Sequence, residues 1–231
     1  MSAPSLPLIS LVHPSRGRPA KALATLDHWR ARARAPERLE HLLSLDADDP
    51  ELPAYVAGFA ARPGTSTLVH ANRCVVEATN QAARYARGQI LVYLSDDFAC
   101  PEAWDLLLGQ AFAAGASDGR AVCDSPRLVK VDDCLQQFLK RVLTIPIMNR
   151  ALYQALGYFW HPDYRSMFVD QDLFEVCLNR GWLVLRPDLR FPHEHPANGK
   201  AADDETYRRS SANWEQGKAV FLRRAAEGFA V

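Results

Sequence analysis

The chain alternates short apolar runs with longer segments of helical pattern, and this alternation limits its possible folds more than any other feature. The clearest run is residues 89–94, which is apolar after its first residue and ends in Ser95-Asp96-Asp97. A strand that is apolar along its length is buried on both faces, and such strands are usually parallel. Alternating strands and helices then predict an α/β fold, with a mostly parallel Rossmann-type sheet flanked by helices.

The same patterns predict the other elements. Strands are expected at residues 6–12, 39–45, 67–70, 121–123, 127–131 and 182–185. Helices are expected at residues 21–34, 51–61, 75–87, 104–114, 149–156, 170–179 and 213–226. Residues 158–164 are aromatic and contain a proline, so they are expected to form a loop.

The composition is that of a soluble globular protein. The 231 residues fit a single domain, and 27 basic residues balance 27 acidic ones. A neutral chain argues against bulk electrostatic binding to nucleic acid or to anionic membranes. We see no secretory signal in residues 1–7 and no apolar stretch of about 20 residues. The sequence therefore predicts a cytoplasmic protein without a transmembrane segment.

The cysteines indicate no metal centre of their own. Five are scattered along the chain, and none forms a CxxC pair. Zinc–thiolate sites need closer spacing. We therefore expect buried, reduced thiols.

Polar clusters follow three of the expected strands: Ser15-Arg16, residues 46–49, and residues 95–97. In parallel α/β sheets, ligands bind beyond the carboxyl ends of the strands. Because all three clusters fall at such ends, the sequence predicts one binding site along that edge of the sheet.

Asp96 and Asp97 are the first candidates for chemistry. Two adjacent carboxylates repel each other and favour a shared proton or a bound cation. Mg²⁺ and Mn²⁺ prefer oxygen ligands and accept diphosphate oxygens as partners. The alternative is that Asp97 caps the helix that follows.

His193-Glu194-His195 is the second candidate. On an extended segment alternate residues point the same way, so both imidazoles can face one metal site. The alternative is a pair of surface histidines. A zinc hydrolase would need a third ligand, and none is obvious nearby.

Asp170 and Asp172 lie at the start of an expected helix. An acid there can act as a general base if it reaches a substrate hydroxyl, or it can simply interact with the helix dipole. The aromatic stretch before them contains Trp160 and His161, which are candidates for the wall of a site because aromatic faces stack on sugar rings. Phe159 is expected in the core.

Taken in order, these residues resemble the family 2 glycosyltransferases with the GT-A fold, from about residue 8 to residue 207. Ile9 to Pro19 resembles the nucleotide-binding start of that family, and Ile90 to Asp97 resembles the strand that carries its DxD-type motif. Residues 169–173 with Asn179-Arg180-Gly181 are similar to its acceptor-side motif. Two positions depart from the pattern, because Ser95 and Val169 stand where carboxylates are common.

The resemblance implies a single GT-A-like domain, with residues 1–97 binding the nucleotide sugar and residues 98–231 the acceptor. It implies a sugar transfer, inverting and dependent on Mn²⁺ or Mg²⁺, from a nucleotide-diphospho-sugar to a hydroxyl. Asp170 would be the catalytic base. The donor-binding residues would be Pro14, Ser15, Arg16, Asp46, Asn72, Asn80, Ser95 and Asp96. The metal ligands would be Asp97 with His193 or His195, and the acceptor side would contain Trp160, His161 and Asp172.

Two other functions fit the same pattern. A sugar-phosphate nucleotidyltransferase can use a similar sheet and metal, but it usually has a basic Gly-rich loop, of which residues 15–18 are a faint version. A non-catalytic sugar-nucleotide-binding module would not need Asp170. Nucleic acid is not indicated as a partner, although a modified base remains a conceivable acceptor.

Overall fold

The computed structural model describes residues 7–114, 122–135, 138–194 and 211–231. In these residues seven strands form one sheet in the order β3-β2-β1-β4-β6-β5-β7. The strands are β1 (Ile9–Ser15), β2 (Leu39–Asp46), β3 (Thr65–His70), β4 (Ile90–Tyr93), β5 (Leu128–Asp132), β6 (Ile147–Asn149) and β7 (Leu183–Arg190). The predicted α/β class with a mostly parallel sheet is confirmed.

The first four strands are all parallel, whereas the second half of the sheet is mixed. β1 pairs with β2 and β4, and β2 pairs with β3, each in parallel. β6 runs antiparallel to both β4 and β5, and β7 is parallel to β5. The carboxyl ends of β1, β2 and β4 therefore lie side by side.

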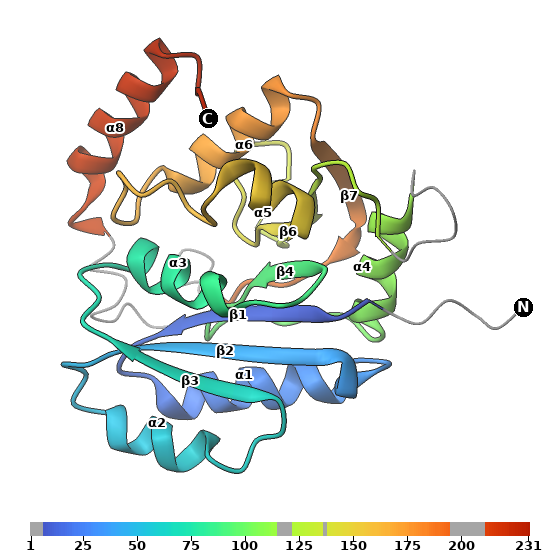
Figure 1. Ribbon diagram of the computed structural model, residues 1–231, viewed down its shortest axis with the longest axis vertical. Helices are drawn as coiled ribbons and strands as arrows, with labels where there is room; N and C mark the ends of the chain where they lie inside the picture. The colour runs from blue at the N-terminus through green and yellow to red at the C-terminus, as the bar shows by residue number, and fades with distance from the viewer. Residues whose placement is uncertain (1–6, 115–121, 136–137, 195–210) are drawn as a thin grey trace, which may run out of the picture.

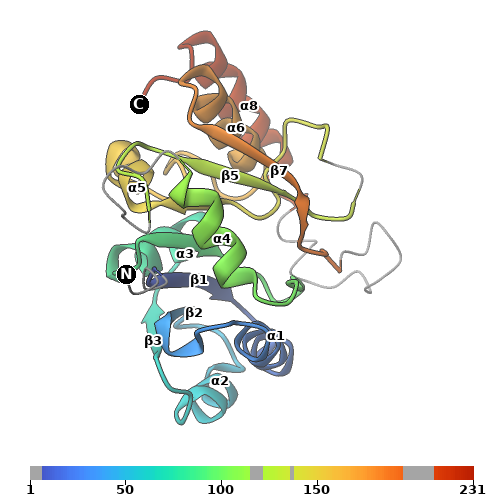
Figure 2. The same ribbon diagram turned by 90° about the vertical axis from the view of Figure 1, so that its right-hand side faces the viewer.

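Helices cover both faces of the sheet (Figure 1). They are α1 (Pro19–Ala31), α2 (Leu52–Phe59), α3 (Val75–Tyr85), α4 (Trp104–Ala113), α5 (Arg150–Leu156), α6 (Val169–Asn179) and α8 (Trp214–Ala226), with a short 3₁₀ turn at Pro36–Arg38. Figure 2 shows α4 crossing the sheet near α1, while α8 and α6 lie together at the other end. Among the described residues, no helix is both long enough and apolar enough to cross a bilayer.

Two apolar cores lie on opposite faces of the sheet. Ile9 and Leu11 of β1 point into the first core, and Val12 points into the second. The first core includes Trp29 of α1 and Trp104 of α4, whose rings meet edge to face at 4.8 Å between centroids. Side chains of β1 thus serve both cores, as expected for a strand that is covered on both faces.

Helix α1 also fixes the segment after β4. The indole Nε1–H of Trp29 donates to the carbonyl of Phe98 at 2.8 Å, and the Thr25 hydroxyl donates to the carbonyl of Asp96 at 2.8 Å. Because α4 begins only at Trp104, with Ala103 as its N-cap, Asp97 caps no helix. The capping alternative for Asp97 is therefore wrong.

Two strand predictions are also wrong in detail. Residues 122–123 form no strand, and Ala121 lies outside the described residues. The carbonyl of Cys123 instead accepts a hydrogen bond from the Asn149 side chain at 3.0 Å, so no partner strand is needed. The last strand continues past residue 185 to Arg190, through Pro187, which is tolerated because β7 lies at the edge of the sheet.

Candidate functional site

A cleft of about 650 Å³ lies beyond the carboxyl ends of β1, β2 and β4. We call one wall the strand side, because its residues follow these strands: Ser15, Arg16, Asp46, Asp96 and Asp97. We call the other wall the helix side, because it comes from α6, α8 and the loop before α6: Trp160, Phe168, Asp170 and Trp214. The predicted site at this edge of the sheet is thus a cleft with two walls.

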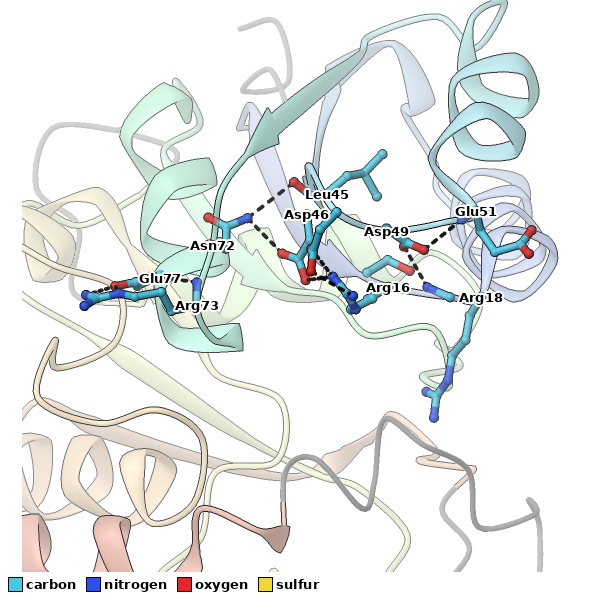
Figure 3. Close-up of polar contacts among 12 residues, drawn as sticks. Arg16, Arg18, Leu45, Asp46, Asp49, Glu51, Asn72, Arg73 and Glu77 are labelled. Carbon is cyan, nitrogen blue, oxygen red and sulfur yellow. Dashed lines mark hydrogen bonds and ion pairs between the residues drawn. The ribbon is translucent and has the colours of Figure 1, made fainter.

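The outer rim of the strand side is a cluster of ion pairs and hydrogen bonds (Figure 3). Arg16 donates to Asp46 at 2.9 Å and pairs with Asp48 through both terminal nitrogens. Asn72 donates to the carboxylate of Asp46 at 3.0 Å and to the carbonyl of Leu45 at 3.3 Å. The pairing with Asp48, followed by that with Asp46, raises the pKa of Arg16. The Asp46 carboxylate is therefore held by two side chains from different loops.

Deeper in the strand side, a buried hydrogen-bond network ends on Asp96. Nε2 of His13 lies 2.8 Å from Oδ1 of Asp96, and the Ser15 hydroxyl donates to Oδ2 at 2.9 Å. Nδ1 of His13 lies 3.0 Å from Nε2 of His41, and the Ser15 hydroxyl lies 2.6 Å from that of Tyr55. Burial, and then the neighbouring His13, lower the pKa of His41 well below its usual range, so His41 is neutral. Both oxygens of Asp96 are occupied from within the fold.

Asp97 and His193 meet at the floor of the cleft. Nε2 of His193 lies 3.4 Å from Oδ2 of Asp97. The backbone brings them together, because Phe98 and His193 form an antiparallel bridge and the amide of Glu194 donates to the carbonyl of Asp97 at 2.8 Å. His195 lies outside the described residues. The sequence left the two histidines equivalent, and the structure places His193 beside Asp97.

These two side chains suit a particular kind of metal site. Among the described residues, no three His, Cys, Asp or Glu side chains converge as a protein-only site would require. Mg²⁺ and related ions in phosphate-binding sites are often held by only one or two protein groups, with substrate phosphates and water completing the shell. One carboxylate and one imidazole facing the cleft fit such a site.

Asp170 lies on the helix side, in the first turn of α6, and is partly exposed to the cleft. Burial raises the pKa of its carboxyl to about 6, against the lowering effects of backbone N–H groups from Gln171, from Asp170 itself and from Leu143, and of the charge of Lys130. Phe168, just before α6, has a φ of +70°, a costly conformation that is often found at functional sites. Asp170 therefore combines access to the cleft with a pKa close to neutrality.

Asp172 differs from Asp170 although it is two residues away. It is 1% exposed and does not line the cleft. Tyr164 donates to its carboxylate at 3.0 Å, and Arg224 of α8 donates to both of its oxygens. These contacts tie α8 to α6.

Two other residues of the predicted set also lie behind the cleft wall. The Asn80 side chain donates to the carbonyl of Trp160 at 2.7 Å and accepts from the amides of Phe159 and Trp160. His161 is half-buried between the rings of Tyr158 and Tyr164 and does not line the cleft. Asn80 thus holds Trp160 in the wall from behind.

The site residues predicted from the sequence do not include Trp214 and Arg165, although both line the helix side of the cleft. Trp214 is 48% exposed and meets Phe168 edge to face at 4.8 Å between ring centroids. α8 can come this close because residue 217 is a glycine: a Cβ at this position would lie only 2.3 Å from the carbonyl oxygen of Met167. Nothing in the sequence around Trp214 indicates the cleft, since the contact depends on how α8 docks.

Comparison with known proteins shows the fold. No protein-family model and no curated protein matches the chain. The mannosyltransferase PcManGT from Pyrobaculum calidifontis, solved in complex with GDP-Man and Mn²⁺, matches with a TM-score of 0.68 and 18% identity over 95% of this chain and 65% of that chain. TarS 1–349 from S. aureus, solved with UDP-GlcNAc, matches with a TM-score of 0.60 and 12% identity over 86% of this chain and 63% of that chain.

The chain thus spans slightly less than two thirds of the length of these structures. The first is a mannosyltransferase by its description, and the shared architecture is the GT-A fold.

Proposed function

We propose that the chain transfers a sugar from a nucleotide-diphospho-sugar to an acceptor hydroxyl, with inversion and with a divalent metal, as a member of family 2 of the glycosyltransferases. One observation supports this most strongly: Asp170, with a pKa of about 6, lines the same cleft as the Asp97–His193 pair. A general base and a site for a charged leaving group are the two parts that such a transfer needs.

Asp170 acts as the base. Above a pH of about 6 its carboxylate is ionised, and it takes the proton from the acceptor hydroxyl. The acceptor oxygen forms a bond to the anomeric carbon, and the bond from that carbon to the diphosphate oxygen breaks on the opposite face. A base with a pKa near the working pH contributes roughly 10²–10⁴-fold to the rate.

The strand side binds the donor, with residues 1–97 as the nucleotide-sugar half and residues 98–231 as the acceptor half. Asp46, which Arg16 and Asn72 orient, would accept hydrogen bonds from the nucleobase of the donor. Pro14, Ser15, Ser95 and Asp96 line the cleft between the rim and the floor. Asp97 and His193 would hold Mn²⁺ or Mg²⁺, which would neutralise charge on the departing diphosphate.

The helix side receives the acceptor. Trp160 forms a buried part of its wall, and Trp214 offers an exposed ring close to Phe168 and the start of α6. Aromatic rings provide a large contact area with few rotatable bonds, which suits the binding of a sugar ring or an apolar acceptor.

The first experiment is a thermal-shift screen of nucleotide sugars with and without Mn²⁺, followed by product analysis with the donor that stabilises the protein most. Release of a nucleoside diphosphate, with the sugar attached to an acceptor, supports the proposal. Release of pyrophosphate would identify a nucleotidyltransferase, and binding without any product would identify a non-catalytic module.

Asp170→Asn tests the base. We expect transfer to fall by roughly 10²–10⁴-fold, with nucleotide-sugar binding unchanged. Asp163→Asn is the matched control, because this aspartate is exposed, precedes α6 and does not line the cleft. Unchanged transfer in Asp170→Asn would remove Asp170 from the mechanism.

A further inference from the structure

Two buried imidazoles connect β1 and β2 behind the strand side of the cleft. His13 and His41 are both 0% exposed, and neither lines the cleft. Nδ1 of His13 lies 3.0 Å from Nε2 of His41, and Nε2 of His13 lies 2.8 Å from Oδ1 of Asp96. Nδ1 of His41 lies 3.4 Å from the Thr65 hydroxyl of β3. A chain of hydrogen bonds thus runs across three strands to Asp96, which does line the cleft.

This chain has a direction. An ionised carboxylate can only accept, so the nitrogen of His13 that faces Asp96 carries a proton. Burial, followed by the neighbouring His13, lowers the pKa of His41 well below its usual range, so His41 carries a single ring proton. If that proton is on Nε2, it is donated to Nδ1 of His13, and Nδ1 of His41 can accept from Thr65. Both imidazoles are then neutral, and every donor in the chain points towards Asp96.

A second chain reaches the other oxygen of Asp96. The Ser15 hydroxyl donates to Oδ2 at 2.9 Å, and a hydroxyl has only one proton to donate. Ser15 therefore accepts from the Tyr55 hydroxyl, 2.6 Å away, and Tyr55 accepts from the amide of Arg18 at 2.8 Å. This chain also points towards Asp96, and it starts at the N-cap of α1.

The two chains fix the plane of the Asp96 carboxylate. The rotamer of an aspartate does not fix this plane, because its χ2 torsion has broad energy wells. The main chain is held as well, since the carbonyl of Asp96 accepts from Thr25 at 2.8 Å. A carboxylate has acceptor sites for about four hydrogen bonds. With one side chain on each oxygen, Asp96 can therefore still accept from a ligand in the cleft.

We propose that His13 and His41 are positioning residues, which orient Asp96 towards hydroxyl groups of the donor although neither imidazole lines the cleft. In this arrangement both imidazoles are neutral and protonated on Nε2. The hydrogen bond made by one ring nitrogen determines whether the other carries the proton, so His41 selects the form of His13 that donates to Asp96. The importance for donor binding rests on the proposed function, whereas the direction of the hydrogen bonds does not.

Another buried polar contact between the same two strands provides a comparison. The Ser10 hydroxyl of β1 donates to the carboxylate of Glu40 of β2, and the amide of Gly88 donates to Ser10 at 2.7 Å. Ser10 is as buried as His13 but lies near the other end of β1, and none of these three residues lines the cleft. Loss of the Ser10 hydroxyl therefore removes a buried contact between β1 and β2 without reaching Asp96.

The first test examines the ring nitrogens of the wild-type protein by ¹⁵N NMR, without any ligand. We expect Nε2 of both histidines to be protonated and Nδ1 of both to be bare. A scalar coupling should connect Nε2 of His41 with Nδ1 of His13 through the shared proton. His13→Gln and His41→Gln assign the signals. A bare Nε2 on His13, a proton on its Nδ1, or the absence of the coupling would overturn the proposal.

The second test measures the binding of ADP, CDP, GDP and UDP, each with Mn²⁺, by calorimetry. For the nucleotide that the wild type binds most tightly, affinity should fall by roughly 3–10-fold in His41→Leu, the effect of about one hydrogen bond. It should be largely restored in His41→Gln, whose amide can donate to His13. Ser10→Ala is the matched control, which should lose stability in urea but bind like wild type. Wild-type affinity in a folded His41→Leu, or an equal loss in Ser10→Ala, would overturn the proposal.

Transfer assays separate this role from the proposed function. If transfer occurs, His41→Leu should raise the donor KM and leave kcat nearly unchanged, as expected when an interaction shared by substrate and transition state is lost. A wild type that neither binds a nucleotide nor transfers a sugar would reject the proposed function, and with it the role in donor binding, while the predicted ring protons would keep the direction of the chains. Transfer by a protein in which Nε2 of His13 is bare would do the reverse.

Discussion

The two walls of the cleft hold their carboxylates in different ways. On the strand side, Asp96 accepts hydrogen bonds from the side chains of His13 and Ser15, and Asp46 is held by Arg16 and Asn72. On the helix side, Asp170 is approached by backbone amides, and burial raises its pKa to about 6. One wall therefore offers fixed charges suited to binding, and the other a carboxylate that can exchange a proton.

The same contrast occurs within α6. Asp172 is paired with Arg224 and Tyr164 in the protein interior, while Asp170 faces the cleft. Two acids two residues apart thus have different surroundings, because the first turn of the helix points one of them at the cleft and the other at α8. The difference indicates which acid is available for chemistry and which holds the fold together.

The largest effect is expected for Asp96→Ala. This substitution leaves the buried groups of His13 and Ser15 without their acceptor, which should lower the free energy of unfolding by roughly 2–5 kcal/mol. Urea denaturation measures the loss. Asp27→Ala is the control, because its ion pair with Arg62 is exposed and contributes less than about 1 kcal/mol. A loss no larger than that of the control would show that the strand side is not a stabilising network.

A smaller effect is expected for metal binding in Asp97→Asn and His193→Ala. Each should weaken Mn²⁺ binding, measured by calorimetry in the presence of a nucleoside diphosphate, by about 10–100-fold or more. That corresponds to about 1.4–2.7 kcal/mol. His161→Ala, which alters an imidazole behind the cleft wall, should bind Mn²⁺ like wild type. Equal affinity in all three variants would place the metal elsewhere.

Asp170→Asn should stabilise the protein above a pH of about 6. The folded pKa of about 6 lies above the ordinary value of 3.8, so the native state binds the proton more tightly than the unfolded state. The wild type therefore loses stability as pH rises from about 4 to 6, and an asparagine does not. Since Asp170 is partly exposed, we expect a gain of about 1–2 kcal/mol at pH 7 that disappears below pH 4. A gain that is independent of pH would mean that the ionisation of Asp170 is not its cause.

The sequence predicted the strand side better than the helix side. Residues 90–94 are apolar because β4 is covered on both faces, and parallel neighbours bring the polar groups after β1, β2 and β4 to one edge. This information is local, since each strand and the residues after it are contiguous. The fold class, and the gathering of these polar groups at one edge of the sheet, followed directly.

The helix side depends on contacts between distant segments, which local patterns do not encode. β6 has only three residues, Ile147–Asn149, and is too short to show a pattern. His193 is distinguished by its backbone bridge to Phe98, and Trp214 reaches the cleft through the docking of α8.

The smallest effect on stability is expected for Arg16→Met, at the rim of the strand side. Its pairs with Asp46 and Asp48 are partly exposed, so the free energy of unfolding should fall by only about 1 kcal/mol or less. Arg62→Met provides the control for loss of an exposed ion pair. Nucleotide-sugar affinity should nevertheless decrease, because Asp46 loses a partner that orients it. Weaker binding with near-normal stability would show that the rim serves ligand binding. A large loss of stability would instead show that the rim belongs to the same stabilising network as Asp96.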